Sequence, residues 1–133
     1  MSITGHCHCG AISFVAEGKP LYHALCHCAD CRSWSGTPVS SWMAFKTDQL
    51  TITGQPVRYR SSENATREFC GSCGTGLFYR NQNLLPDMVD IQSGTIDNLA
   101  LHPATTQIMT KDKLPWMDKL ETLPRFQKYP GME

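Results

Sequence analysis

The amino-acid sequence predicts a mainly β fold with antiparallel strands and little helix. Apolar residues occur in short runs in which they alternate with polar residues, as in strands that bury one face. Turn-forming residues interrupt these runs at short intervals, a spacing typical of antiparallel sheets. A chain of 133 residues can bury a core of its own, and no repeat or linker divides it. We therefore expect residues 1–133 to form a single domain.

Seven runs are expected to form strands. They comprise residues 12–16, 39–45, 50–53, 57–60, 77–79, 88–92 and 106–109. Segments rich in Gly, Pro, Asn and Ser separate them, at residues 18–20, 54–56, 61–64, 81–83 and 102–103. Only two stretches favour a helix, residues 29–35 and residues 118–123, and the second is bounded by Pro115 and Pro124.

The charge balance excludes several classes of partner. Lys and Arg number 12, Asp and Glu number 12, and no block of five like charges is present, so the basic surface of a nucleic-acid or anionic-membrane binder is missing. The N-terminal segment lacks the features of a secretion signal, and no stretch approaches the ~18 apolar residues of a membrane span. We expect a cytoplasmic protein without nucleic-acid or membrane partners.

Seven cysteines stand out in this composition. The cytoplasm keeps thiols reduced, and an odd number of thiols cannot all pair within one molecule. The cysteines fall into three clusters, namely Cys7 and Cys9, then Cys26, Cys28 and Cys31, then Cys70 and Cys73. Clustering at these spacings indicates metal binding.

The first and third clusters can each supply two ligands to one ion. Residues i and i+2 of an extended strand point to the same face, so Cys7 and Cys9 would converge in an extended segment. Cys70 and Cys73 form a Cys-x-x-Cys knuckle, and Gly74 after it can take the positive φ that such a turn often requires. The four thiols together predict a closed tetrahedral zinc site of the structural type.

The middle cluster has three thiols and no evident fourth ligand. Cys26, Cys28 and Cys31 therefore predict a second zinc that keeps one position for water or substrate, as catalytic zinc sites do. A zinc bound by three thiolates carries a net charge of about −1, which makes it a weak Lewis acid. Such an ion is better suited to binding and activating a thiol.

Other arrangements of these thiols stay open. Both zincs could be structural, or one zinc could be accompanied by reduced core thiols. His27, His23 or Asp30 could complete the middle site, because imidazole and carboxylate both bind zinc. Cys28 and Cys31 could also form a redox pair, although no parallel strand–helix–strand pattern surrounds them.

The histidines next to the cysteines are expected to face away from them. In an extended segment His6 and His8 point opposite to Cys7 and Cys9, which makes them surface or packing residues. The same alternation turns His27 away from the cysteines on either side of it, in preference to a role as a proton relay.

Three motifs carry a resemblance to a known family: Gly5-x-Cys7-x-Cys9-Gly10, Cys26-His27-Cys28-x-x-Cys31-Arg32-x-x-Ser35-Gly36 and Phe69-Cys70-x-x-Cys73-Gly74. They resemble the motifs of the glutathione-dependent formaldehyde-activating enzyme family, which includes centromere protein V. The likeness continues at residues 53–54, 59–62, 93–97, 113–116 and 123–126, and so spans nearly the whole chain.

The resemblance implies a β-tent fold of twisted antiparallel sheets around zinc sites. It also implies two zinc ions per chain, a structural one on Cys7, Cys9, Cys70 and Cys73 and a catalytic one on Cys26, Cys28 and Cys31, which is the partition that ligand counting suggests. The implied activity is that of a carbon–sulfur lyase, similar to S-(hydroxymethyl)glutathione synthase. A thiol such as glutathione adds to formaldehyde or a related small aldehyde and gives an S-hydroxymethyl adduct. The alternative function is a non-catalytic zinc-binding scaffold for protein interaction.

Three residues close to the middle cluster are candidates for substrate binding. Arg32 could hold a carboxylate of glutathione with its planar guanidinium group. Ser35 and Gly36 form at least a turn, and they could contact the ligand through the backbone.

The tryptophans and the remaining acidic residues have less specific expectations. Trp34, Trp42 and Trp116 are expected in the core or in the wall of a pocket. Asp87 and Asp90 show no partner pattern and are expected in solvent.

Overall fold

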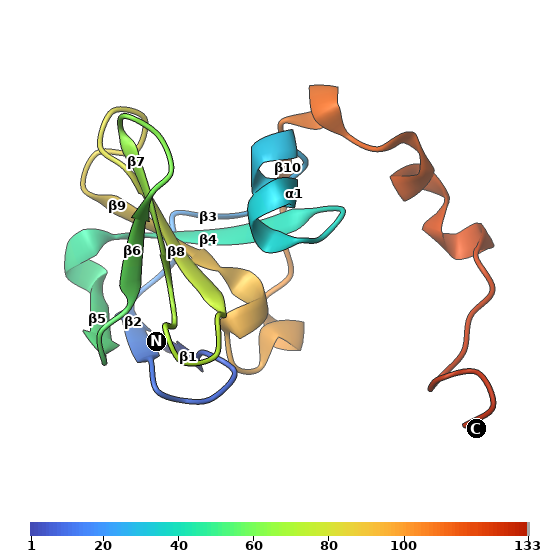
Figure 1. Cartoon of the computed structure of the whole chain (residues 1–133), viewed down its shortest axis with the longest axis horizontal. Coiled ribbons are helices and arrows are strands. Elements are labelled where there is room, and N and C mark those ends of the chain that lie inside the picture. Colours follow the sequence, from blue (N-terminus) through green and yellow to red (C-terminus); the bar gives the residue numbers. More distant parts are fainter. Residues whose placement is uncertain (133) are drawn as a thin grey trace.

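The computed structural model describes residues 1–132, whose strands form two sheets (Figure 1). The smaller sheet has three antiparallel strands in the order β1-β2-β5. These strands are β1 (Ser2–His6), β2 (Ser13–Glu17) and β5 (Leu50–Thr53).

The larger sheet has seven strands in the order β10-β3-β4-β9-β8-β7-β6. They are β3 (Tyr22–Cys26), β4 (Ser40–Lys46), β6 (Val57–Arg60), β7 (Ala65–Phe69), β8 (Gly76–Asn81), β9 (Met88–Gln92) and β10 (Thr106–Ile108). Neighbouring strands are antiparallel except β10, which reaches the β3 edge through a long connection and is parallel to β3. The predicted mainly β fold of antiparallel sheets is confirmed, with this one parallel pair as an exception.

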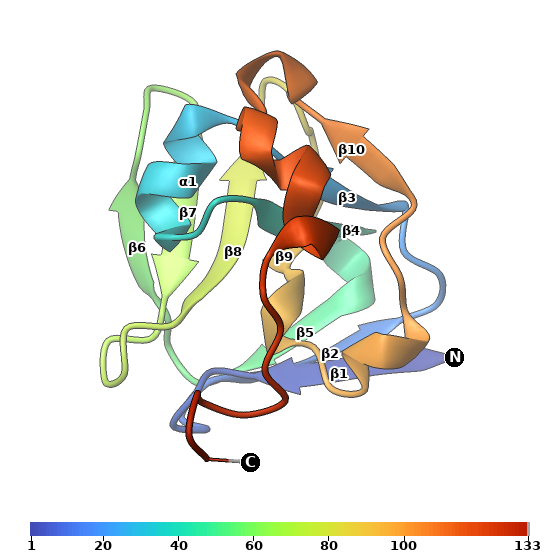
Figure 2. The ribbon, with the colours of Figure 1, turned by 90° about the vertical axis from the view of Figure 1, so that its right-hand side faces the viewer.

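Helical structure is limited to short segments. The α-helix α1 (Ala29–Ser35) coincides with the helix predicted there. Short 3-10 segments occupy Thr47–Gln49, Ser93–Thr95, Leu99–Leu101, Thr110–Asp112 and Pro115–Thr122. The last of these contains most of the second predicted helix and extends away from the two sheets (Figure 1), an extension that Figure 2 views end-on. Among residues 1–132, no helix has the length and apolar composition needed to cross a membrane.

The main hydrophobic core lies where the two sheets pack together. It contains Ile3 and Phe14 from the small sheet and Met43, Phe45, Phe78, Val89 and Ile91 from the large sheet. The rings of Phe14 and Phe78 meet edge to face with their centroids 5.6 Å apart. Because side chains alternate along a strand, Met43 and Phe45 on β4 point into this core and Trp42 lies on the opposite face. That opposite face is the one that carries the site described below.

All seven predicted strands are present, but the sequence pattern does not predict β1, β3 and β7. The sequence pattern does not predict β7 because this strand contains two adjacent charged residues that are both buried, Arg67 and Glu68. Glu68 accepts hydrogen bonds of 2.9 Å from Arg58 Nε and from Arg80 Nε. Burial of paired charges removes the alternation that identifies a strand.

Gly5 on β1 lies in a tightly packed position. A Cβ atom at this position would overlap with the ring of Phe14 and with the carbonyl oxygen of Thr95. Only glycine fits between these two neighbours without a shift of the backbone or the ring.

We expect the substitution Gly5→Ala to lower the free energy of unfolding by about 1–3 kcal/mol, the usual cost of overpacking. Urea denaturation measures the change. The matched control is Gly94→Ala, because no atom lies within 4 Å of the position of its Cβ. Equal stability of the two variants would contradict the close packing around Gly5.

Candidate metal centres and the adjoining cavity

Four thiols gather between the two sheets. The Sγ atoms of Cys7, Cys9, Cys70 and Cys73 all lie within 4.8 Å of one another. The distance between the Sγ atoms of Cys7 and Cys9 is 3.7 Å, and that between Cys9 and Cys70 is 3.8 Å. Four sulfurs about 2.3 Å from a central ion form a tetrahedron with edges of about 3.8 Å. The four-thiol group therefore has the dimensions of a closed metal site.

The turns that present these thiols differ in part from the predicted geometry. The expectation of an extended strand through Cys7 and Cys9 is wrong, because β1 ends at His6 and the amide of Gly10 donates a 3.1 Å hydrogen bond to the carbonyl of Cys7. The two sulfurs converge through this turn. The predicted knuckle is present, since the amide of Gly74 donates a 2.8 Å hydrogen bond to the carbonyl of Cys70 and Gly74 has a φ of 84°.

The four-thiol group joins loops from different sheets. Cys7 follows β1 in the small sheet, whereas Cys70 follows β7 in the large sheet, and both side chains are buried in the main core. Backbone amides of Ile12 and Ser72 donate to the sulfurs of Cys7 and Cys70 over 3.3 and 3.4 Å. The donor to Cys7 favours its thiolate, the form that binds metal.

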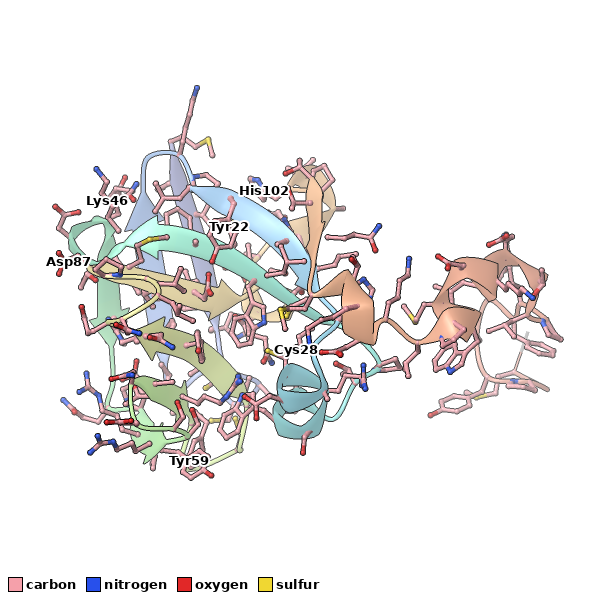
Figure 3. The ribbon with its side chains drawn as sticks, turned by 90° about the horizontal axis from the view of Figure 1, so that it is seen from above. Tyr22, Cys28, Lys46, Tyr59, Asp87 and His102 are labelled. Carbon is pink, nitrogen blue, oxygen red and sulfur yellow. The ribbon has the colours of Figure 1, made fainter. Side chains whose placement is uncertain are left out.

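The three-thiol group lies on the other face of the large sheet. Cys26 ends β3, Cys28 is the N-cap of α1, and Cys31 lies within α1. The sulfurs of Cys26 and Cys31 are 3.8 Å apart, and Cys28 Sγ accepts a 3.2 Å hydrogen bond from the amide of Cys31. Figure 3 shows Cys28 beside α1 with other sulfur atoms close to it. The spacing again matches the edge of a tetrahedron of sulfurs around one ion.

The thiols of this group differ in acidity. The hydrogen bond from Cys26 lowers the pKa of Cys31 to about 5 despite burial, and the positive charge of Arg67 acts in the same direction. The same hydrogen bond, together with burial, raises the pKa of Cys26. Cys31 is therefore the thiol that ionises first.

Among residues 1–132, no histidine, aspartate or glutamate joins the three thiols as a fourth ligand. His27 Nε2 lies 2.8 Å from Gln107 Oε1, and His23 Nε2 lies 2.9 Å from Ser93 Oγ. The carboxylate of Asp30 accepts a 2.7 Å hydrogen bond from Arg67. His27 thus faces away from the thiols, as expected.

A cavity of about 310 Å³ adjoins the three-thiol group, and all three cysteines line it. Its walls are mostly apolar, with Trp42, Tyr79, Leu84, Leu85 and Ile108 among them. A small, largely apolar space next to thiols is the form expected of a small-molecule site.

The register of the large sheet explains which other side chains reach this cavity. Tyr22 pairs with Ala44, Ala44 with Asp90, Asp90 with Tyr79, and Tyr79 with Arg67. Paired residues project to the same side of a sheet, so these five form one row across β3, β4, β9, β8 and β7. Ala44 at the centre of the row has only a methyl group, which leaves space between its larger neighbours.

Arg67 is the buried cation of this row. Its side chain is 2% exposed, and its Nη2 lies 2.7 Å from Asp30 Oδ2 and 3.7 Å from Cys31 Sγ. The guanidinium group also lies over the rings of Tyr79 and Trp34, at 4.8 and 5.6 Å from their centroids. A positive charge is therefore held directly beside the three thiols.

Asp90 contradicts the expectation that it lies in solvent. It is 6% exposed, it lines the cavity, and its Oδ1 accepts a 2.7 Å hydrogen bond from the hydroxyl of Tyr22. Burial raises the pKa of Asp90 to about 6, and the hydrogen bond from Tyr22 opposes this shift. Asp87 is exposed, as expected.

Arg32 lies in the middle of α1, Ser35 is its last residue and Gly36 is its C-cap, and none of the three lines the cavity. Arg32 Nη1 donates to the carbonyls of His27 and Asp112 over 2.8 and 2.7 Å. Ser35 Oγ donates to the carbonyl of Cys31 over 2.6 Å, and Gly36 ends the helix with a φ of 69°. These contacts orient the segment that carries the thiols.

The three tryptophans have different surroundings. Trp42 is buried and lines the cavity, and Trp34 stacks on Tyr59 with centroids 5.9 Å apart. Both fit the predicted role in a core or pocket wall. Trp116 does not, because it is 49% exposed on the extended C-terminal segment.

No sequence signal marks Tyr22, Arg67, Tyr79 and Asp90 as site residues. They come from four strands and meet only through the register of the sheet.

Two proteins of other organisms are similar to this chain in sequence. A protein of Halomonas elongata named as a glutathione-dependent formaldehyde-activating enzyme is 26% identical over 128 residues, which cover 89% of this chain and 81% of that protein. An uncharacterized lyase of Schizosaccharomyces pombe is 32% identical over 79 residues, which cover 59% of this chain and 58% of the yeast protein.

A crystal structure of a Rhodobacter sphaeroides protein has a similar fold. The TM-score is 0.62 at 18% identity, and the match covers 78% of this chain and 98% of the other. The sequence model of the family described as glutathione-dependent formaldehyde-activating enzyme matches residues 2–112, a range that contains all seven cysteines. The chain therefore belongs to the glutathione-dependent formaldehyde-activating enzyme family.

Proposed function

We propose that this chain is a zinc-dependent enzyme of the carbon–sulfur lyase type. It adds a glutathione-like thiol to formaldehyde or a related small aldehyde and yields an S-hydroxymethyl adduct. The observation that carries the proposal is the three-thiol group, which lines a cavity and has no fourth ligand among residues 1–132. A metal held by three protein ligands keeps one position for a substrate.

Zinc is the ion that best fits both thiol groups. The donor sets consist of sulfur alone, and the sulfur–sulfur distances of 3.7 and 3.8 Å suit a tetrahedral ion with bonds of about 2.3 Å. Cys7, Cys9, Cys70 and Cys73 would hold a structural zinc. Cys26, Cys28 and Cys31 would hold a catalytic one, which when bound supplies a positive charge that lowers the pKa of a substrate thiol.

The residues around the cavity would favour addition of a thiol to an aldehyde. The apolar walls formed by Trp42, Leu84 and Leu85 limit water, which would otherwise compete with the thiol for the aldehyde carbon. Arg67 partly balances the negative charge of the thiolates beside it. Confinement of both reactants in about 310 Å³ favours their encounter over reaction in bulk water.

The choice of glutathione and formaldehyde rests on the family and on the name of the Halomonas relative. Substrate contacts by Arg32, Ser35 and Gly36 stay predictions, and so does a single domain spanning residues 1–133. A cytoplasmic location also stays a prediction, in agreement with the reduced thiols that the proposal requires.

We expect protein purified without oxygen to contain about two zinc ions per chain, one of which a mild chelator removes. Glutathione should protect the removable ion, because it would occupy the open position. Elemental analysis before and after dialysis measures both effects. Two equally inert zinc ions that glutathione does not affect would favour the scaffold function instead.

The substitutions Cys70→Ala and Cys28→Ala should have different effects. Loss of Cys70 should abolish cooperative thermal unfolding, since a structural zinc contributes about 10 kcal/mol or more to small metal-dependent folds. Loss of Cys28 should leave a folded protein with one zinc. Calorimetry and elemental analysis check this, and equal unfolding of both variants would contradict the assignment of the two sites.

Formation of the adduct can be measured directly at equilibrium. Two-dimensional exchange NMR with ¹³C-formaldehyde follows the interconversion of free aldehyde and S-hydroxymethylglutathione. We expect the wild-type protein to accelerate this exchange and Cys28→Ala to return it to the uncatalysed rate, because the variant lacks one of the three catalytic-site ligands. Equal rates with the wild-type protein, the variant and no protein would refute the proposed function.

A further inference from the structure

We propose that Asp90 is a catalytic residue of this cavity and carries a proton between the substrate thiol and the aldehyde oxygen. This inference rests on the proposed function, because it assigns a proton carrier to that reaction. It does not follow from the cysteine motifs, which lie on other elements of the chain.

The location of Asp90 provides the first argument. Asp90 lies on β9 and projects to the face of the large sheet that is opposite the main core. It lines the same cavity as Cys26, Cys28 and Cys31 and is 6% exposed. A carboxyl group buried to this extent requires partners or a function, because burial of an unpaired charge is costly.

The hydrogen bonding of Asp90 provides the second argument. Its Oδ1 accepts the hydroxyl hydrogen of Tyr22 at 2.7 Å, and burial keeps that hydroxyl protonated by raising the pKa of Tyr22. Within residues 1–132, Oδ2 accepts no hydrogen bond, and it is not fully enclosed by other atoms. Because Asp90 lines the cavity, this free oxygen can accept a proton there while Tyr22 holds the carboxyl group in place.

The charged and titratable groups around the cavity set the proton affinity of Asp90. They are Tyr22 and Cys26 on β3, Cys28, Asp30 and Cys31 at α1, Arg67 on β7 and Tyr79 on β8. Burial raises the pKa of Asp90 to about 6, the hydrogen bond from Tyr22 lowers it, and the negative charge of Cys31 raises it. A carboxyl group with this pKa is mostly ionised at pH 7 and still accepts a proton readily.

The proton balance of the addition is simple. The S–H proton of the substrate moves to Asp90 Oδ2 and leaves a thiolate. The sulfur lone pair forms a bond to the aldehyde carbon, and the π electrons of the C=O bond move to oxygen. The proton on Oδ2 then passes to that oxygen and completes the S-hydroxymethyl product. No oxidant or reductant is required, and Asp90 returns to its ionised state.

Proton release on glutathione binding tests this assignment without an activity assay. At pH 7 the wild-type protein should release less than one proton to the buffer, because the negative charge of the bound thiolate raises the pKa of Asp90 further and Asp90 keeps part of the thiol proton. Asp90→Asn should release about one proton, since the amide cannot take it up. Titration calorimetry of zinc-loaded protein in buffers with different ionisation enthalpies gives these numbers. Equal release by the two proteins would overturn the assignment of Asp90.

The pH dependence of the exchange rate gives a second readout. Asp90→Asn should slow the exchange by about 10²-fold or more, the usual contribution of a general acid–base group. The rate of the wild-type protein should rise with pH through about 6, as Asp90 ionises. Tyr22→Phe should move this rise to higher pH, because it removes a hydrogen bond that favours the ionised form. This variant tests the proposal even if Asp90→Asn does not fold.

The matched control is Asp87→Asn, which makes the same chemical change at an exposed position of the same region. Figure 3 shows Asp87 near Lys46, at the side of the sheet remote from Cys28. This control should match the wild-type protein in both readouts. If zinc-loaded wild-type protein neither binds glutathione nor forms the adduct, the proposed function fails and the role of Asp90 fails with it. Binding and turnover that are unchanged in Asp90→Asn would overturn the role of Asp90 alone.

Discussion

The four-thiol group is the constraint on which the rest of the structure depends. It joins the turn after β1 in the small sheet to the knuckle between β7 and β8 in the large sheet. The same two strands carry Arg67 and Tyr79 into the cavity. A metal ion held by these thiols would therefore fix the distance between the sheets and also the position of one wall of the cavity.

Side chains alternate along the strands of the large sheet, so that residues of the main core lie on one face and residues of the cavity lie on the other. On β4, Met43 and Phe45 pack against the small sheet, whereas Trp42 lines the cavity on the opposite face. On β9, Val89 and Ile91 enter the core and Asp90 between them faces the cavity. A polar residue at position 90 is tolerated because only one face of this strand belongs to the main core. Substitutions of the side chains that face the cavity can thus change its chemistry without a change in the packing between the sheets.

The sequence predicts the parts of the structure that depend on neighbouring residues. Short alternating runs predict seven strands, and the spacing of the cysteines predicts which thiols come together. Features that depend on distant residues are not predicted. Strand β7 is missed because its charges at Arg67 and Glu68 are neutralised by side chains from other elements. Asp90 is assigned to solvent for the same reason, since its partner Tyr22 lies 68 residues earlier in the chain.

The charges of the cavity connect the metal site to the proposed proton carrier. Three thiolates with a divalent ion have a net charge of about −1, and Arg67 at 3.7 Å from Cys31 opposes that charge. Asp30 partly neutralises Arg67, because its Oδ2 lies 2.7 Å from Arg67 Nη2. The cavity therefore stays unfavourable for a further anion. Asp90 is such an anion, and burial, together with the negative charge of Cys31, raises its pKa. Burial and the negative charge of Cys31 therefore make the nearby carboxylate a better acceptor for the proton that the thiol gives up.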